Sequence, residues 1–283
     1  MLAYLNGEFL PLENAQLHVS DLAIQRGYGI FDFFRVNERV PLYLEDYLDR
    51  FYRSSAIMGL EGVIDRPALK EVVYQLIRRN GMQEAGMKLI LTGGYSPDAY
   101  HPVKGNFLVS QHPLVLPTAA QVAEGISIIT YPYRREIADV KTINYIMGVW
   151  LLKKMKEARA ADVLYHRDGI VSEFPRCNFF LVTRQGTLVT PANHILHGIT
   201  RMRVLEVAPS ACPVEVRDVR LEEVYEAGEA FLTSTTKGVL PIVNIDNRPV
   251  GSGKPGPVTL ALRDLLRQRE RAELQKSHQV QNS

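Results

Sequence analysis

The chain has 283 residues, of which 46% are hydrophobic and 23% are charged. This composition excludes a chain that is disordered throughout, because enough apolar surface is available for a sizeable core. The 33 Lys and Arg residues against 31 Asp and Glu residues give a formal net charge of +2. The basic residues are scattered along the chain, so the charge pattern does not point to nucleic acid.

Cysteines, histidines and apolar runs narrow the class of protein further. Cys177 and Cys212 are too few for a disulfide framework and lack metal-ligand spacing. The seven histidines show no H-x-x-x-H pairing, so no metal site is expected. The N-terminal residues do not have the basic and apolar regions of a signal peptide, and no apolar run reaches membrane-spanning length. We therefore expect a soluble, unprocessed protein of the cytoplasm.

The first part of the chain combines hairpins with two helices. Asn6-Gly7 favours positive φ and so a two-residue turn, and a second hairpin is expected around Asn37-Glu38. Helical periodicity follows at 44–60, and again from Pro67 to Asn80, where a proline and a following glycine mark the ends. Strands are expected at 2–5, 8–10, 30–36, 39–44, 87–92 and 106–110. The beginning of the chain is therefore predicted to be α+β.

Prolines and small residues between 111 and 122 interrupt both periodicities, which favours an interdomain connection at 113–121. We expect a small α+β domain over 1–112 and a larger α/β domain over 122–283. The second domain is predicted to have strands at 126–131, 162–166, 179–183, 187–190 and 229–233, and helices at 143–159, 200–208 and 258–267. The charged end from 267 to 283 lacks a sustained apolar stripe and is expected to fray.

Two stretches carry groups suited to covalent or acid–base chemistry. Lys141, in D-V-K-T-I-N-Y, stands between a loop and a predicted helix. A helix dipole there would disfavour the ammonium form and favour the neutral amine that forms imines, whereas an ordinary surface lysine is the alternative. Glu173 lies in a polar turn before an apolar strand, where its carboxylate faces either a cofactor or water.

Three further stretches suit an anion. Gly198-Ile199-Thr200 precedes a predicted helix, whose first N–H groups and the threonine hydroxyl would form an anion site. The alternative is that Thr200 is an N-cap, which is the commoner role for such a residue. Thr235-Thr236 lies in a hydroxyl-rich turn after a buried strand. Arg50 lies on the apolar side of the helix at 44–60, where an arginine needs an anion. Its spacing alone favours an ion pair with Asp46.

Together these stretches resemble the class IV aminotransferases, the pyridoxal-phosphate enzymes of fold type IV. The family includes branched-chain aminotransferases, D-amino-acid transaminases and aminodeoxychorismate lyase. Its K-[ST]-x-N-Y pattern falls on Lys141 to Tyr145, its E-x4-N-[IF]-F pattern on Glu173 to Phe180, and its G-I-T-R pattern on Gly198 to Arg201. The resemblance runs from Asn6-Gly7 through Pro241, with the patterns in the family's order.

The resemblance implies an α+β, two-domain enzyme of fold type IV with pyridoxal 5'-phosphate as its cofactor. Lys141 would carry the cofactor as a Schiff base and then move the substrate proton, and Glu173 would keep the pyridine nitrogen protonated. The other cofactor contacts implied are Arg50, Tyr145, Asn178, Ile199, Thr200, Thr235 and Thr236. A homodimer with its active site near the interface is also implied.

Substrate contacts are expected at Arg26, Tyr28, Phe31, Lys88 and Arg176. The segment from Gln25 to Asp32 resembles the family's R-G-x-x-Y-G-x-G-x-F-E but is shorter and ends in aspartate, which predicts an altered pocket. The expected reaction moves an amino group between a D-amino acid or branched-chain amino acid and a 2-oxo acid such as 2-oxoglutarate. The alternatives are an aminodeoxychorismate lyase and, from another class, a catalytically silent protein that binds a phosphorylated ligand.

Overall fold

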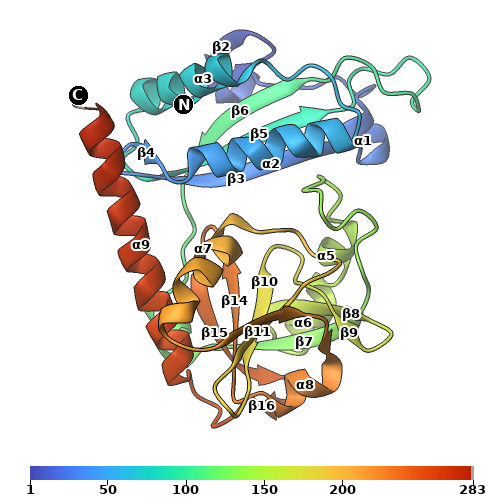
Figure 1. The fold of residues 1–283 in the computed structure, drawn as a ribbon. Coiled ribbons are helices and arrows are strands. Elements are labelled where there is room, and N and C mark those ends of the chain that lie inside the picture. The colour runs from blue at the N-terminus through green and yellow to red at the C-terminus, as the bar shows by residue number, and fades with distance from the viewer. Residues whose placement is uncertain (282–283) are drawn as a thin grey trace. The chain divides into compact units, whose positions relative to one another are not determined.

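A computed structural model describes residues 1–281, with side chains described through residue 277. The chain divides into two compact units (Figure 1). The first unit comprises Met1–Leu114, Val140–Asn144 and the end of the chain from Glu273. The second comprises Val115–Asp139 and Tyr145–Ala272. No helix among the described residues combines the length and apolarity needed to cross a membrane.

The first unit is built on a six-stranded antiparallel sheet in the order β2-β1-β6-β5-β3-β4. Its strands are β1 (Leu2–Leu5), β2 (Glu8–Pro11), β3 (Gly29–Asn37), β4 (Val40–Pro41), β5 (Ala85–Thr92) and β6 (Phe107–His112). Its helices are the 3-10 turn η1 (Leu12–Asn14), α1 (Leu22–Arg26), α2 (Leu44–Ile57) and α3 (Arg66–Asn80). The α+β organisation expected for this part of the chain is confirmed.

One face of this sheet is packed against α2 and α3, and the other is half-buried. Phe34 on β3 contacts Tyr47 on α2 with ring centroids 5.5 Å apart, and Phe51 on α2 lies 5.8 Å from Phe107 on β6. Residues that alternate with these along β3 and β5, including Phe31 and Lys88, point to the opposite face. The side chains of Phe31 and Lys88 therefore lie away from the helices of this unit, whereas Asp32 points toward α2.

The two hairpins differ in how well the sequence predicted them. The turn at Asn6-Gly7 is confirmed, because both residues have positive φ and Leu5 pairs with Glu8. The second turn lies one residue later than expected, at Glu38-Arg39, which have φ of 51° and 62°. The strand after it, β4, has two residues instead of the expected six.

The second unit contains a ten-stranded mixed sheet in the order β12-β11-β10-β14-β15-β7-β8-β9-β13, with β16 paired to β15. The strands are β7 (Ile126–Pro132), β8 (Asp162–Arg167), β9 (Ile170–Val171), β10 (Asn178–Val182), β11 (Leu188–Pro191), β12 (Val214–Arg217), β13 (Val219–Arg220), β14 (Glu229–Ser234), β15 (Gly238–Ile245) and β16 (Arg248–Pro249). The helices are α4 (Ala119–Glu124), α5 (Ile146–Trp150), α6 (Leu152–Glu157), α7 (Ile199–Val207), the 3-10 turn η2 (Ala208–Ser210), α8 (Leu221–Glu226) and α9 (Pro257–Gln281).

Three apolar clusters hold the second unit together. The largest includes Phe174, Phe179 and Leu232, from the turn before β10, from β10 itself and from β14. Another joins Phe180 and Phe231, stacked with centroids 4.9 Å apart, to residues of α7 and α9. A third packs α5 and α6 near β7 and β8. The strands predicted at 126–131, 162–166, 179–183, 187–190 and 229–233 are all present within one to two residues.

The helix predicted at 143–159 is wrong in its first turn and in its continuity. Residues 141–143 run in extended pairing beside β3: the Phe31 N–H donates to the Lys141 carbonyl at 2.9 Å, and the Ile143 N–H donates to the Gly29 carbonyl at 3.0 Å. These main-chain hydrogen bonds with β3 override the helical pattern at this point. Helix α5 begins only at Ile146, and the chain breaks again at Leu151 before α6.

The prediction that residues from 267 onward fray is wrong for 267–281, because α9 continues to Gln281, and residues 282–283 lie outside the described part of the chain. The first turn is fixed by the Glu229 carboxylate, which accepts from the Val258 and Thr259 N–H groups at 3.1 and 2.7 Å. Leu262 and Leu266 pack in the apolar cluster of α7, and Leu274 is buried two turns further along. This widely spaced apolar row was missed in the sequence.

Candidate active site

Lys141 lies on the half-buried face of the six-stranded sheet. The extended pairing with β3 fixes its backbone, and its Nζ stands 4.6 Å from the centroid of the Phe31 ring. The side chain is therefore not the ordinary surface lysine of the alternative interpretation. The helix-dipole argument for Lys141 does not hold, because α5 starts five residues later and has only five residues. The amine instead faces the Phe31 ring, and the Lys141 side chain is half-buried.

Lys88 is the second cation over the same ring. It projects from β5, and its Nζ lies 5.5 Å from the Phe31 centroid. Burial, and then the positive charge of Lys141, lower the pKa of Lys88. Phe31, Lys88 and Lys141 are thus three of the expected site residues that the structure brings together.

Arg50 is buried between α2 and β3, where it faces Asp32. Its Nε donates to Asp32 Oδ2 at 2.9 Å and its Nη2 donates to Asp32 Oδ1 at 2.6 Å. The side chains are 5% and 1% exposed. The inward position expected for Arg50 is confirmed, with a carboxylate partner from β3 that helical spacing did not predict. The hydrogen bonds to Asp32 use two of the five N–H donors that a guanidinium carries.

Glu173 is a buried carboxylate held at both oxygens, which excludes the solvated alternative. It is 4% exposed. Its Oε1 accepts from Arg135, and its Oε2 accepts from the Leu196 N–H at 2.9 Å and from Asn178 Nδ2 at 3.3 Å. Hydrogen bonds of this kind favour the ionised form of a carboxylate. The side chain is suited to facing a cationic ring nitrogen.

Arg135 contacts the Glu173 carboxylate directly, and the sequence did not single it out. Its Nε and Nη2 donate to Glu173 at 2.9 and 2.6 Å, and its Nη2 also donates to the Ala138 carbonyl. The only sequence signal was the dipeptide Arg134-Arg135, six residues before Lys141, and neither periodicity nor a family pattern selected it. The first position of the pair is half-buried, whereas Arg135 is 12% exposed.

The start of α7 has the geometry of an anion site. Gly198 is the N-cap and no side chain caps the first turn, so Thr200 is the second helical residue and the N-cap interpretation is wrong. A Cβ at Gly198 would stand 2.1 Å from Asn178 Oδ1, and Asn178 Nδ2 donates to the Leu196 carbonyl at 2.7 Å. A side chain at position 198 would collide with Asn178, so glycine is the residue that fits there. The N–H groups of Ile199 and Thr200 lie in the first turn of α7, which no side chain caps.

The hydroxyl-rich turn after β14 supplies further donors in the same unit. Thr235 and Thr236 are half-buried at the β14–β15 turn, which is closed by the Lys237 N–H donating to Ser234 Oγ at 3.2 Å. Thr233 pairs across the sheet with Asn178, and its buried Oγ1 has no hydrogen-bond partner within residues 1–277. An orphaned hydroxyl, an uncapped helix start and a glycine that no side chain can replace fit a phosphorylated cofactor.

The remaining candidates are more dispersed. Tyr145 is half-buried at the N-cap of α5 and is one of the ionisable side chains around Arg135. The Tyr28 hydroxyl donates to the Met58 carbonyl at 2.7 Å, which ties it to the end of α2. Arg26 is exposed and donates to the Gln25 carbonyl at 2.8 Å, and Arg176 is exposed in the turn before β10. Arg26 and Tyr28 thus donate to main-chain carbonyls of Gln25 and Met58.

The family of the chain follows from a match over most of its length. Residues 29–245 match the model of the family described as amino-transferase class IV. The chain belongs to the aminotransferase class IV family. Its six-stranded and ten-stranded sheets are those of a fold type IV enzyme, and the match includes Lys141, Glu173, Thr200 and Thr236.

Individual class IV relatives cover nearly the whole chain. A D-alanine aminotransferase from Bacillus licheniformis is 29% identical over 265 residues, which are 92% of this chain and 93% of that protein. A T.th. branched-chain amino acid aminotransferase, solved with pyridoxamine 5'-phosphate, is 26% identical with a TM-score of 0.87 over 96% of this chain and 94% of that chain. The same enzyme with N-(5'-phosphopyridoxyl)-L-glutamate gives a TM-score of 0.86 at 26% identity and the same coverage.

Proposed function

We propose that this protein is an aminotransferase that uses pyridoxal 5'-phosphate to move an amino group between an amino acid, D- or branched-chain, and a 2-oxo acid such as 2-oxoglutarate. The observation that carries the proposal is the class IV match over 29–245, which includes the lysine, the buried carboxylate and both anion-binding elements. The relatives support it, since one is a D-alanine aminotransferase and the other a branched-chain aminotransferase that was solved with a glutamate adduct.

We assign a separate role in the reaction to each of three residues of the chain. Bound pyridoxal phosphate supplies an electron sink for the negative charge that develops at the substrate Cα. Lys141 would hold the cofactor through its amine and would move the proton at the substrate Cα. Glu173, ionised and fixed at both oxygens, pairs with the ring nitrogen. Asn178 keeps Glu173 and the segment before α7 in place.

The phosphate of the cofactor is assigned to the two anion-binding elements of the second unit and to Arg50. The N–H groups and hydroxyl at Ile199 and Thr200, and the hydroxyls of Thr235 and Thr236, are the donors. The Asp32 carboxylate fixes the guanidinium plane of Arg50. Tyr145 is assigned to the 3-oxygen of the ring.

Lys88 is the strongest candidate for a substrate carboxylate among the five substrate residues. It lies on the same Phe31 ring as the amine of Lys141, whereas the Tyr28 hydroxyl is held by Met58 and Arg26 and Arg176 are exposed. We expect Lys88→Met to raise the KM for amino acids and 2-oxo acids without removing the bound cofactor. A KM that rises in Arg26→Met and not in Lys88→Met would transfer this role to Arg26.

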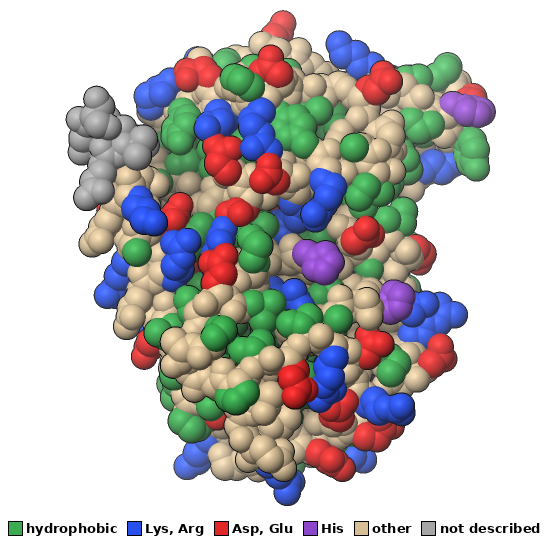
Figure 2. All heavy atoms as spheres, in the orientation of Figure 1, with side chains coloured by type: hydrophobic (Ala, Val, Ile, Leu, Met, Phe, Trp, Pro, Cys, Tyr) green, Lys and Arg blue, Asp and Glu red, His purple; other side chains and the backbone are tan. Residues whose placement is uncertain are grey.

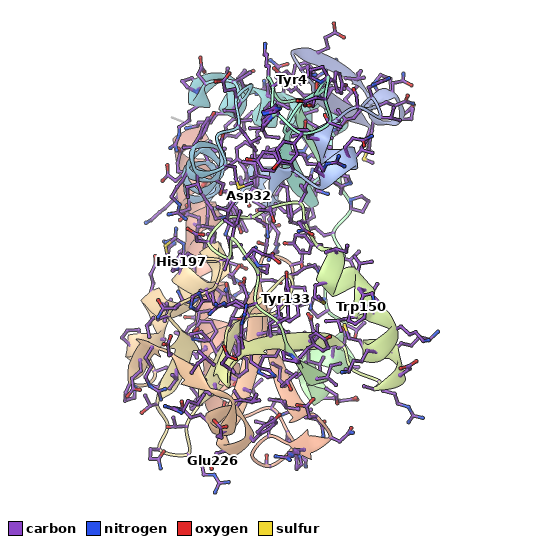
Figure 3. All side chains as sticks on the ribbon, turned by 90° about the vertical axis from the view of Figure 1, so that its right-hand side faces the viewer. Tyr4, Asp32, Tyr133, Trp150, His197 and Glu226 are labelled. Atoms are coloured by element: carbon purple, nitrogen blue, oxygen red, sulfur yellow. The ribbon has the colours of Figure 1, made fainter. Side chains whose placement is uncertain are left out.

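We also propose a homodimer, supported by an exposed apolar surface on and beside α5. Ile146, Val149, Trp150 and Leu152 are between 56% and 73% exposed, and Trp150 is labelled on α5 in Figure 3. Apolar side chains gathered in this way mark interaction surfaces. A second copy of the chain would bury them.

The test of the function begins with the cofactor. Purified protein should be yellow with pyridoxal phosphate, should bleach on borohydride reduction with the label on Lys141, and should lose the visible band in Lys141→Ala. Lys153→Ala, at a lysine whose side chain is 88% exposed, is the matched control and should stay yellow. Colourless protein that gains no visible band with added cofactor would contradict the proposal. It would favour the alternative of a catalytically silent protein that binds a phosphorylated ligand.

The reaction is then read from a panel of D- and L-amino acids. Conversion of the yellow form to the pyridoxamine form, followed by its return with 2-oxoglutarate, identifies amino transfer and the handedness of the substrate. Release of pyruvate from aminodeoxychorismate without an amino acceptor would instead identify the lyase.

A further inference from the structure

The Glu173 carboxylate interacts with more than one positively charged side chain. The ionisable groups that face it come from several elements of the second unit: Arg135 from the segment before Lys141, Arg201 from α7, Tyr165 from β8 and, around Arg135, Tyr133 and Tyr145. Burial raises the pKa values of Tyr165 and Tyr133, so these hydroxyls are neutral near pH 7. The arginines therefore balance the charge of Glu173.

Arg135 and Arg201 interact with Glu173 in different ways. Arg201 reaches the Thr190 hydroxyl at 3.3 Å and the Pro191 carbonyl at 2.9 Å, so it acts on Glu173 only through its charge. Arg135 contacts the carboxylate directly, because its Nε and Nη2 both donate to Oε1 of Glu173. Charge-assisted hydrogen bonds of this kind are stronger than neutral ones, and the two donors together restrict the orientation of the carboxylate. Although burial acts to lower it, the pKa of Arg135 is raised by the charge and hydrogen bonds of Glu173.

The same guanidinium holds a second point of the chain. Arg135 Nη2 donates to the carbonyl of Ala138, which stands three residues before Lys141 in the sequence. One side chain thus fixes both the carboxylate assigned to the ring nitrogen and the segment that leads to the reactive lysine. Neither contact depends on a bound ligand.

We propose that Arg135 is a positioning residue that keeps Glu173 ionised and oriented and restrains the approach to Lys141, a role that rests on the function proposed for Glu173. Without Arg135, a carboxylate buried to this degree would take up a proton, because desolvation disfavours its charge. The ring nitrogen would then lose its anionic partner. Arg135 acts through Glu173 and not on the substrate.

The first test uses the apoprotein, so it does not depend on cofactor chemistry. Denaturant unfolding is followed between pH 5 and 8 for the wild type, Arg135→Met, Glu173→Gln, the double variant and Arg135→Lys. In Arg135→Met the pKa of Glu173 should rise above its unfolded value, so this variant should gain stability relative to the wild type as the pH falls. Adding Glu173→Gln should abolish that gain. A pH dependence in Arg135→Met equal to that of the wild type would overturn the proposal.

The second test uses the cofactor-loaded protein and has a spectroscopic readout. The visible band of bound pyridoxal phosphate is titrated with pH. Arg135→Met should titrate like Glu173→Gln and bind the cofactor about tenfold more weakly, whereas Arg135→Lys should remain close to the wild type. Arg134→Met is the matched control and should leave the band unchanged. Arg135→Met with the wild-type titration overturns the inference.

The two proposals fail in distinguishable ways. A wild type that binds no pyridoxal phosphate contradicts the function, while the apoprotein cycle still measures the coupling between Arg135 and Glu173. If Arg135→Met does not fold, Arg135→Lys and the double variant carry the test. A double variant no more stable than a folded Arg135→Met at pH 8 would contradict the proposed ionised state of Glu173.

Discussion

At the scale of single residues, the Arg50–Asp32 pair shows how one contact supports both packing and a proposed function. Both side chains are almost fully buried and share two hydrogen bonds. Removing one member of such a pair leaves a charge in a place where water cannot solvate it. The pair therefore stabilises the contact between α2 and β3 while it orients the guanidinium proposed for the phosphate.

We predict that Asp32→Asn destabilises the protein by about 3 kcal/mol, the scale for breaking a buried ion pair. Urea unfolding of the apoprotein measures the loss. Asp49→Asn is the matched control, because Asp49 pairs with Arg66 on the surface, where such pairs contribute at most about 1 kcal/mol. Equal losses in the two variants would contradict the structural importance of the Arg50 pair.

Two histidines make stability depend on pH. Burial, and then the charge of Lys88, lower the pKa of His112, and burial lowers that of His166. A histidine with a lowered folded-state pKa binds fewer protons when folded, so its contribution is present above pH 6.5 and is lost as the pH falls. We predict that His112→Gln and His166→Gln each lose less stability than the wild type between pH 7 and pH 5. His194→Asn, at an exposed position, should follow the wild type.

At the scale of secondary structure, α9 depends on a cap supplied by a distant strand. The Glu229 carboxylate at the start of β14 accepts from the N–H groups of Val258 and Thr259 and from the Thr259 hydroxyl. A carboxylate in this position satisfies unpaired donors and interacts favourably with the helix dipole.

We predict that Glu229→Ala destabilises the protein by about 1–2 kcal/mol, the scale of a lost N-cap. Thermal or urea unfolding measures the change, and Glu222→Ala in the exposed first turn of α8 serves as the control. Thr259→Val, which removes only the hydroxyl contact, should fall between the two. A loss in Glu229→Ala no larger than in Glu222→Ala would show that α9 does not need this cap.

Local chemistry predicted the elements whose signals lie within a few residues. Asn6-Gly7 marks a hairpin because both residues adopt positive φ, and Pro67 and Gly81 mark the ends of α3. The start of the helix predicted at 143 was misread, because Ile143 pairs with β3, more than a hundred residues away, and α5 begins only at Ile146. Long-range pairing of this kind cannot be read from periodicity.

The difference between local and long-range signals also explains which site residues the sequence identified and which it missed. Glu173 and Thr200 stood in sequence patterns that the family match contains, and their burial and helix position then followed from the fold. Arg135 has its role only because the turn before β10 brings Glu173 to it, 38 residues along the chain. Asp32 likewise reaches Arg50 through the packing of α2 on β3. Partners set by tertiary packing leave no local signal.

At the scale of the whole molecule, the exposed apolar side chains of α5 differ from the mixed charged surface seen elsewhere. Basic and acidic side chains are interspersed over the face drawn in Figure 2, in keeping with the small net charge. The exposed side chains of Ile146, Val149 and Trp150 are instead contiguous on one short helix. Trp150 packs edge-on against Tyr131 with centroids 6.1 Å apart, which holds the surface in shape.

We predict that the wild type has twice the chain mass of 31.9 kDa in solution and that Ile146→Glu with Val149→Glu lowers it toward the monomer, because two charges would have to be buried at the interface. Light scattering over a concentration series measures the mass. Val115→Glu, at an 85% exposed valine outside α5, is the matched control and should leave the mass unchanged. A dimer that persists in the α5 variant would place the interface elsewhere, and a monomeric wild type at all concentrations would contradict the homodimer itself.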